Sequence, residues 1–401
     1  MTIGRSLPAE IVERTDAGGR RLRQLTSAPA HSYPLYYFTP STTADGRWLV
    51  FHSERSGSVQ LYRMDLESGA ITQLSNQERF DAGWAIWCEY RLRGIDNHLS
   101  ALNPVRSEAY YFVGDTLYCT DVEELTNRQV LQLRGRVAIS QNAFSPDGRW
   151  FAFVHTDALS FREGLQERES KTNMGQFSWG RDHNTWRNGI DCVISVVDTT
   201  TGMRQDLLDL DYHVHHVLFA DDDTLLLNHV KGDSGMWTLS MDGTKIRHLR
   251  PRDENGVTCH QAVTARGIYY EANTYVDGER IVQIGRLDAA TGAYEEVRLP
   301  NVGYVHTGLD PEGRFMFYED MQEDRHRLLT VRYPRDPARF EVEELRSLGP
   351  IAHGQRYHAH PFLAAHDRRW LYHTEVIDGF AQICALDVAD LVDENVYWDA
   401  E

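Results

Sequence analysis

Residues 354–361 read Gly-Gln-Arg-Tyr-His-Ala-His-Pro and hold three side chains suited to binding a metal ion. Side chains alternate between the faces of an extended strand, so His358 and His360 are expected on one face, about 6.6 Å apart. Two imidazoles at that spacing can share one metal ion, and the amide oxygen of Gln355 can supply a third ligand. Pro361 lacks an N–H group and favours a strand edge or a bulge. The alternative is a pair of histidines with structural hydrogen bonds, and motifs elsewhere in the chain must decide.

The chain has 401 residues, of which 41% are hydrophobic and 25% charged, as is typical of soluble globular proteins. The first 30 residues lack an apolar core of signal-peptide length, and no apolar run is long enough to span a membrane. The odd number of scattered cysteines, five, predicts reduced thiols and a cytoplasmic location. The net charge of −18 makes nucleic acids and membranes unexpected partners. An acidic ligand would need local cations, which a metal ion can supply. The sequence does not indicate an oligomeric state.

A repeated pattern organises most of the chain. A turn with Asp-Gly or Glu-Gly precedes an apolar strand at residues 43–51, 145–153 and 310–318. A strand–turn–strand pattern follows it at residues 61–74 and recurs in part at 196–202 and 286–292. Together they predict four antiparallel strands per unit, as in a β-propeller blade. Seven such units cover residues 31–75, 80–134, 137–208, 212–250, 257–298, 304–346 and 353–391.

The seventh unit stops after its third strand. Residues 21–26 resemble the outer-strand pattern at 71–74, so the N-terminal strand is expected to complete the last blade and close the ring. The predicted fold is an all-β, seven-bladed β-propeller that forms a single domain over residues 1–401. A polar insertion at 159–188 interrupts the third unit, and a flap over the central opening and a partner-binding loop are equal alternatives for it.

Histidines gather where the innermost strands of the units begin, at the mouth of the central channel. They are His31, His213, His215, His216, His260, His306, His358 and His360. Three histidines with one glutamine offer nitrogen and oxygen ligands without a thiolate, which suits Mn, Fe, Ni or Zn and leaves positions for a substrate. A closed structural zinc site would use cysteines, and Cys259 is expected to pack on the face opposite His260.

The chain resembles the oligogalacturonate lyase family, seven-bladed propellers that bind Mn²⁺ and cleave short pectin fragments. The resemblance covers most of the chain and rests on the repeat and on Thr258-Cys259-His260, Tyr304-Val305-His306 and the Q-x-x-H-x-H pattern of residues 355–360, its most specific motif. By this resemblance His306, Gln355, His358 and His360 bind the metal and His260 is the catalytic base. His31 and His215 fall near positions that contact substrate.

The resemblance implies β-elimination on di- or trigalacturonate, saturated or unsaturated, to give 4-deoxy-5-keto-uronate. The family carries an arginine on the inner strand of blade four, whereas residues 215–219 here contain none. A metal-dependent lyase or isomerase acting on another acidic sugar is therefore an alternative, as is a non-catalytic propeller that serves as an interaction platform. The propeller of a serine peptidase is disfavoured, because no G-x-S-x-G motif follows the seventh unit.

Overall fold

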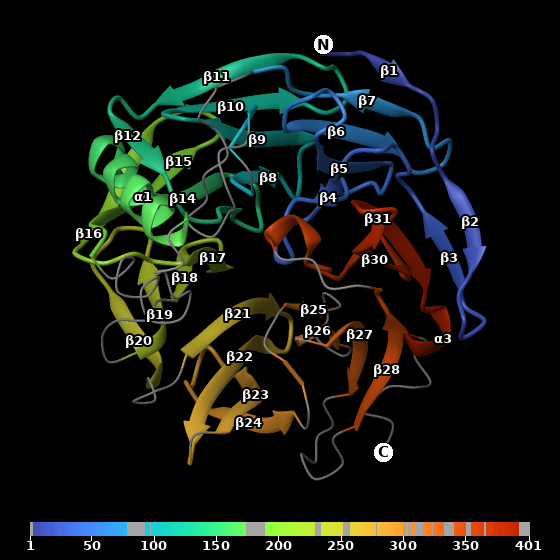
Figure 1. The fold of residues 1–401 in the computed structure, drawn as a ribbon. Helices are drawn as coiled ribbons and strands as arrows, with labels where there is room; N and C mark the ends of the chain where they lie inside the picture. The colour runs from blue at the N-terminus through green and yellow to red at the C-terminus, as the bar shows by residue number, and fades with distance from the viewer. Residues whose placement is uncertain are drawn as a thin grey trace.

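The structure, a computed structural model, describes residues 3–77, 93–96, 98–173, 189–228, 234–251, 257–277, 279–299, 302–303, 306–309, 316–322, 324–332, 341–349, 354–364 and 366–392. Its strands form seven antiparallel sheets arranged as a ring around a central axis (Figure 1). The seven-bladed β-propeller expected from the sequence is confirmed.

Blades one to three are built from consecutive strands. Blade one contains β4 (Ser32–Pro34), β5 (Trp48–Ser53), β6 (Gln60–Asp65) and β7 (Ile71–Gln73), with β1 (Ser6–Leu7) along its outer edge. Blade two contains β8 (Ser100–Leu102), β9 (Glu108–Val113), β10 (Thr116–Asp121) and β11 (Asn127–Gln132). Blade three contains β12 (Arg136–Ala138), β13 (Ala143–Phe144), β14 (Trp150–Asp157), β15 (Cys192–Asp198) and β16 (Arg204–Leu210); its inner strand is split, because β12 and β13 both pair with β14.

Blades four to six follow the same order. Blade four contains β17 (His216–Asp221), β18 (Thr224–Asn228), β19 (Ser234–Ser240) and β20 (Ile246–Pro251). Blade five contains β21 (Val257–Thr264), β22 (Gly267–Val276), β23 (Glu279–Leu287) and β24 (Tyr294–Leu299). Blade six contains β25 (Thr307–Leu309), β26 (Met316–Gln322), β27 (Arg325–Arg332) and β28 (Glu341–Ser347).

The recurring Asp-Gly pair forms the turn before the second strand of blades one and three. Gly46 and Gly148 in these turns have φ angles of 73° and 70°, which glycine adopts without steric cost.

The N-terminal strand closes the ring in blade seven, as predicted. This blade contains β29 (Phe362–Ala364), β30 (Asp367–Ile377) and β31 (Phe380–Asp387). β3 (Arg21–Gln24) pairs with β31, with Leu22 opposite Leu386 and Gln24 opposite Cys384. β2 (Val12–Thr15) adds a fifth, outermost strand, and a short helix, α3 (Ala389–Val392), follows β31. Strands from the N-terminal and C-terminal parts of the chain thus share one sheet, which closes the ring and covers the edges of β31 and β3 that face each other.

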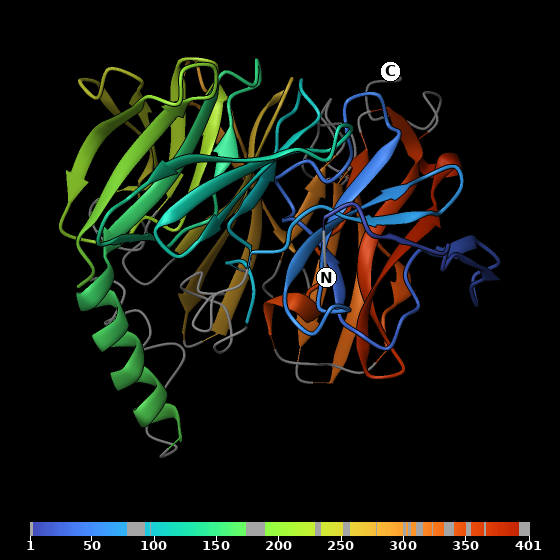
Figure 2. The same cartoon turned by 90° about the horizontal axis from the view of Figure 1, so that it is seen from above.

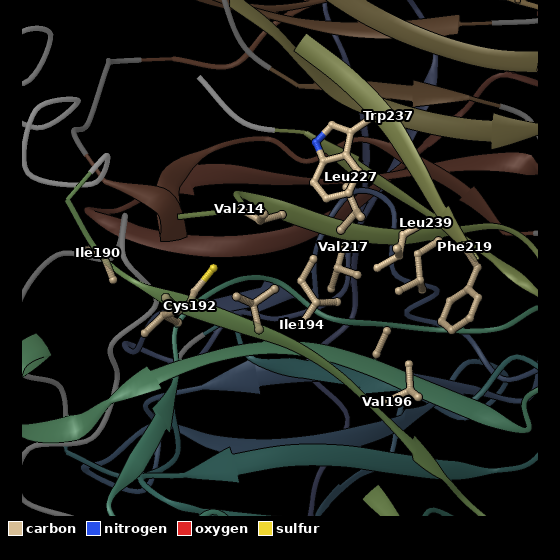
Figure 3. Close-up of a cluster of buried hydrophobic side chains, with 14 of the residues drawn as sticks. Ile190, Cys192, Ile194, Val196, Val214, Val217, Phe219, Leu227, Trp237 and Leu239 are labelled. Atoms are coloured by element: carbon tan, nitrogen blue, oxygen red, sulfur yellow. The ribbon is translucent and has the colours of Figure 1, made fainter. Parts of the chain in front are cut away.

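Apolar cores lie between neighbouring blades. Figure 3 shows Ile194 and Val196 of blade three facing Val217, Leu227 and Leu239 of blade four. A similar cluster joins blade one to blade seven, and it includes Phe51 and Trp370. Because every blade packs against two others, the starts of the inner strands are held at fixed positions around the channel.

The insertion in blade three begins with α1 (Ala158–Asn173), which projects from the ring (Figure 2). Phe161 and Leu165 on its first turns are buried against the core between blades three and four. The second strand of a blade ends on the face where the first strand begins, so α1 leaves the ring on the face that carries the histidines. The remainder of the insertion, residues 174–188, lies outside the described residues. None of the described helices is long and apolar enough to cross a membrane.

Candidate functional site

Imidazole side chains from blades five, six and seven meet at the mouth of the channel. The ring centre of His306 lies 4.2 Å from that of His360, 4.9 Å from that of His358 and 4.6 Å from that of His260. Two imidazoles bound to one ion at metal–nitrogen distances near 2.1 Å have ring centres roughly 4.5–5.2 Å apart. Among the three predicted histidine ligands, the His306–His358 distance falls in this range, the His306–His360 distance is shorter, and the His358–His360 distance, 5.8 Å, is longer.

Residues 354–361 differ locally from the strand expected there. A 3-10 helix, η2 (Gln355–Tyr357), opens the segment, and β29 begins only at Phe362. The backbone of His360 is left-handed, with φ of 42°, and it precedes a proline, so regular pairing is interrupted. The rings of His358 and His360 nevertheless lie on the same side, nearly parallel at 23°, with their centres 5.8 Å apart.

The carboxylate of Glu319, on β26, organises the histidines of blades six and seven. It lies 3.0 Å from His306 Nδ1 and 2.8 Å from His326 Nε2, and it accepts the backbone N–H of Ala359 at 2.8 Å. Burial alone would raise the pKa of Glu319, but nearby His358 and these hydrogen bonds hold that pKa well below its usual value. An ionised Glu319 fixes the proton of His306 on Nδ1, so the lone pair lies on Nε2, where a metal ion can bind.

His360 provides the test of whether a metal ion fits. It is fully buried, and neither of its ring nitrogens has a hydrogen-bond partner among the described residues. Burial, followed by the proximity of His306, lowers its pKa well below the usual value, so the ring is neutral. A buried neutral imidazole without a partner is costly, and a coordinated metal ion would satisfy it. His306, Glu319 and His358 also hold ligand atoms within 4.8 Å of one another, so this part of the protein can bind a metal ion.

His260 forms a separate pair with a second buried carboxyl group. Its Nδ1 lies 2.8 Å from Glu271 of β22, which also accepts the hydroxyl of Tyr318 at 2.9 Å. Burial raises the pKa of Glu271 well above its usual value, against the effect of that hydroxyl. His260 sits at a β-bulge with φ of 51°, a left-handed conformation that is uncommon for residues other than glycine. A proton can pass between this carboxyl group and Nδ1, and when Glu271 is ionised and accepts the Nδ1 proton, the lone pair of His260 lies on Nε2.

The other predicted residues lie around this cluster. His31 sits at the rim, with its Nδ1 accepting the N–H of Ala381 at 3.1 Å and its ring edge-on to Tyr357. Gln355 opens η2, and its amide oxygen is enclosed by protein. His215 lies beside His213, at 5.3 Å between ring centres. Cys259 is buried, as expected for a packed residue.

Sequence reasoning passed over several residues that the fold places in the site. His98, from blade two, was missed and lies 5.8 Å from His360 between ring centres. His216 was expected at the mouth without an assigned role, and its ring centre lies 6.0 Å from that of His260. Glu271 and Glu319 were also missed. A signal for both carboxyl groups exists, because a Tyr-Glu pair interrupts the apolar second strand of blade five and again of blade six.

A loop from blade one forms the floor of the site. The hydroxyl of Tyr36 lies 3.2 Å from His216 Nε2 and 3.4 Å from His306 Nε2, and the ring of Tyr37 lies 5.7 Å from that of His260. On the far side, Phe38 lines a cavity of about 390 Å³ that opens among the other ends of the inner strands. The aromatic side chains thus separate the histidine cluster from the opposite end of the channel.

The fold and the histidine cluster define the protein as a seven-bladed β-propeller with a candidate metal site at the channel mouth. Among solved structures it is similar to an oligogalacturonate lyase in complex with manganese, with a TM-score of 0.78, 19% identity and coverage of 96% of this chain and 98% of that one. Oligogalacturonate lyase from Vibrio parahaemolyticus gives a TM-score of 0.77 and 16% identity, with coverage of 96% and 99%. The resemblance read from the sequence is confirmed at the level of the fold.

A peptidase is a more distant structural match. Acylaminoacyl peptidase of Pyrococcus horikoshii gives a TM-score of 0.53 at 12% identity, and 91% of this chain covers only 54% of that protein. No known family profile matches the sequence, and no curated protein matches it either.

Proposed function

We propose that the protein is a metal-dependent lyase that cleaves short oligogalacturonides, di- and trigalacturonate, by β-elimination, with Mn²⁺ as its metal ion. The observation that carries the proposal is the juxtaposition of two devices. The histidine cluster of blades six and seven lies next to His260, whose Nδ1 is held by buried Glu271. A solved relative of the same fold that is a manganese-bound oligogalacturonate lyase supports this choice of metal and substrate.

β-Elimination on a uronate requires a cation beside the C6 carboxylate and a base for the proton on C5. A divalent ion held by His306, Gln355, His358 and His360 would supply the cation. In the proposed reaction His260 removes the C5 proton through Nε2, since its Nδ1 is engaged by Glu271. The electron pair released from the C5–H bond forms the C4–C5 double bond as the C4–O bond breaks. The leaving oxygen keeps the electron pair of that bond and takes up a proton from water, and the unsaturated uronate then rearranges to the keto form.

The function is tested by supplying purified protein with Mn²⁺ and following the ultraviolet absorbance of unsaturated uronates over a panel of oligouronates. Cleavage of digalacturonate that is abolished by a chelator and restored by Mn²⁺ is the expected result. Protein that retains bound metal but cleaves no member of the panel would contradict the proposal. A non-catalytic platform would give neither signal.

His260→Ala tests the assigned base. This variant should retain its fold and metal and lose turnover by about 10²–10⁴-fold, the usual contribution of a general base. If His260 instead only orients a ligand, metal affinity should fall by about 10–100-fold. His248→Ala on outer strand β20, where the side chain is exposed, is the matched control. Full metal content with near-normal kcat in His260→Ala would refute both roles.

A second substrate class has specific support. The described residues of blade four at the channel mouth, 211–219, contain no arginine. The arginine that oligogalacturonate lyases carry on this strand is therefore replaced by another group or is not needed. A lyase or isomerase acting on another acidic sugar fits the same metal site, and the panel distinguishes them by which oligouronate is turned over. We place the reaction in the cytoplasm, consistent with the buried free thiols of Cys119, Cys192, Cys259 and Cys384.

A further inference from the structure

One arginine stands at the rim of the site, and its contacts differ from those of the other arginines nearby. Arg356 lies in η2 between Gln355 and Tyr357, and its side chain is 21% exposed. Its Nη1 donates to Glu54 of blade one at 2.8 Å, and its guanidinium carbon lies 5.1 Å from the ring centre of Tyr357. Among the described residues, the Nη1 atom of Arg356 has an acceptor, which is Glu54. The Nε atom of Arg356 is buried and has no acceptor among them.

The edge of Arg356 that faces away from Glu54 has the shape that recognises a carboxylate. The Nε and Nη2 atoms of a guanidinium together form a planar fork, which binds both oxygens of a carboxylate through parallel hydrogen bonds. Leaving a buried, charged donor unpaired is unfavourable, so a ligand that supplies the acceptor is stabilised at this position.

Arg55 is a useful contrast because it directly follows Glu54, the residue that pairs with Arg356. Its Nη1 and Nη2 both reach Glu10, and Nη2 and Nε also donate to Ser32 and Ser53. Its guanidinium is therefore fully engaged within the protein, whereas that of Arg356 is engaged on one side.

The surroundings of Arg356 suit a sugar. His31, Tyr357 and Phe380 place aromatic rings next to one another, with centres 5.3 and 5.4 Å apart. His31 is neutral at physiological pH, because burial and the charge of Arg356 lower its pKa to about 4. The rim thus offers one cation flanked by uncharged ring faces, on a protein whose net charge is −18.

We propose that Arg356 binds the carboxylate of the uronate residue adjacent to the one that is cleaved. The inference rests on the proposed function and on the place of Arg356 in η2, next to Gln355 and two residues before His358. Arg356 then sets a minimum substrate of two uronate residues and selects against substrates whose second carboxylate is esterified.

The test compares the variants Arg356→Gln, Arg356→Lys and Arg55→Gln. Calorimetry measures how tightly each binds two ligands: digalacturonate, and digalacturonate methyl-esterified on the uronate adjacent to the one that is cleaved. Arg356→Gln should weaken binding of digalacturonate by roughly 10- to 100-fold, the scale of charge-assisted hydrogen bonds, raise KM more than it lowers kcat, and erase the preference over the ester. Arg356→Lys should recover only part of the affinity, because a lysine lacks the fork. Arg55→Gln should bind like wild type.

Glu54→Gln gives a change in the opposite direction. Removal of this neighbouring negative charge should tighten binding of the ligand carboxylate by about 2- to 5-fold, the scale of a partly exposed ion pair. Mn²⁺ affinity and thermal unfolding, measured on each variant, confirm that the fold and metal cluster are intact. Wild-type affinity and ester discrimination in an intact Arg356→Gln protein would overturn the inference while leaving the lyase proposal standing. Wild-type protein that neither binds nor cleaves any uronate would overturn the proposed function itself.

Discussion

Replacing Glu319 with glutamine tests whether this carboxylate orients a metal-binding histidine or mainly stabilises the fold. The carboxylate accepts hydrogen bonds from His306, His326 and the backbone of Ala359. Glutamine keeps one oxygen but places an NH₂ group where the other oxygen was. If that group faces His306, the imidazole must move its proton from Nδ1 to Nε2, which removes the lone pair needed by a metal ion.

The substitution should change the unfolding free energy of the metal-free protein less than that of the metal-bound protein. Without metal, the new tautomer of His306 can accept from the amide, so unfolding free energy should change by no more than about 1.5 kcal/mol. Loss of a carboxylate behind a ligand typically weakens metal binding by about 10–100-fold. At a metal concentration that stabilises wild type by about 4 kcal/mol, this weakening removes roughly 1.4–2.7 kcal/mol of the stabilisation.

The measurement is urea unfolding of wild type and Glu319→Gln, each with a chelator and with Mn²⁺, together with calorimetric titration of the metal. Glu344→Gln is the matched control, because Glu344 is exposed and pairs with Arg327 at 3.0 Å. Equal Mn²⁺ affinity in wild type and Glu319→Gln would refute the reasoning. A large loss of stability in the chelated protein would instead show that Glu319 serves the fold.

Two further predictions concern the stability of the fold and involve His52 and Gly308. Burial, with a smaller effect of His98, lowers the pKa of His52 from 6.5 to about 3, so the folded state binds fewer protons than the unfolded state. Stability should therefore be complete above pH 6.5 and fall as the pH drops toward 3, and His52→Gln should reduce the slope between pH 6 and 4 by up to about 1.4 kcal/mol per pH unit, measured by chemical unfolding. Gly308→Ala should destabilise the protein by about 1–3 kcal/mol, because a Cβ there would lie 2.0 Å from the carbonyl oxygen of Pro361. Gly18→Ala, which meets only the side chain of Asp16, is the control, and equal melting temperatures for the two variants would contradict the argument.

The ring could be predicted from the sequence because its repeat is local. Each blade uses the same turn and the same alternation of apolar strands, and residues such as Gly46 and Gly148 mark the turns directly. The closing strand could be predicted as well, since Leu22 lies in a segment that resembles the outer strand of another blade and the last unit lacked a partner. Histidines at the first positions of inner strands then had to meet at one mouth.

The contents of the site were harder to predict because they depend on contacts between blades. Nothing in the spacing of residues 355–360 indicates a 3-10 helix, which forms where Gly354, with φ of 126°, and Pro361 disturb the strand. His98 reaches the cluster from blade two, just before β8 begins, and is part of none of the motifs found in the sequence. Tyr36 enters the channel on a loop, and loops carry no period from which their direction can be read.

The two buried carboxyl groups show how one repeated arrangement can serve two kinds of chemistry. Glu271 and Glu319 follow a tyrosine in the second strand of neighbouring blades, and each holds Nδ1 of the histidine from its own blade. Around Glu319, the charge of His358 and the hydrogen bonds of His306 and His326 outweigh burial and hold its pKa low. Glu271 has the hydroxyl of Tyr318 and a raised pKa, because burial there outweighs its hydrogen bond. A fixed anion favours an imidazole that keeps its lone pair for a metal ion, whereas a basic carboxyl group favours an imidazole that gains and releases a proton. If His306 binds the metal ion and His260 is the base, as proposed, their difference arises one layer behind the histidines, in the groups that surround each carboxyl group.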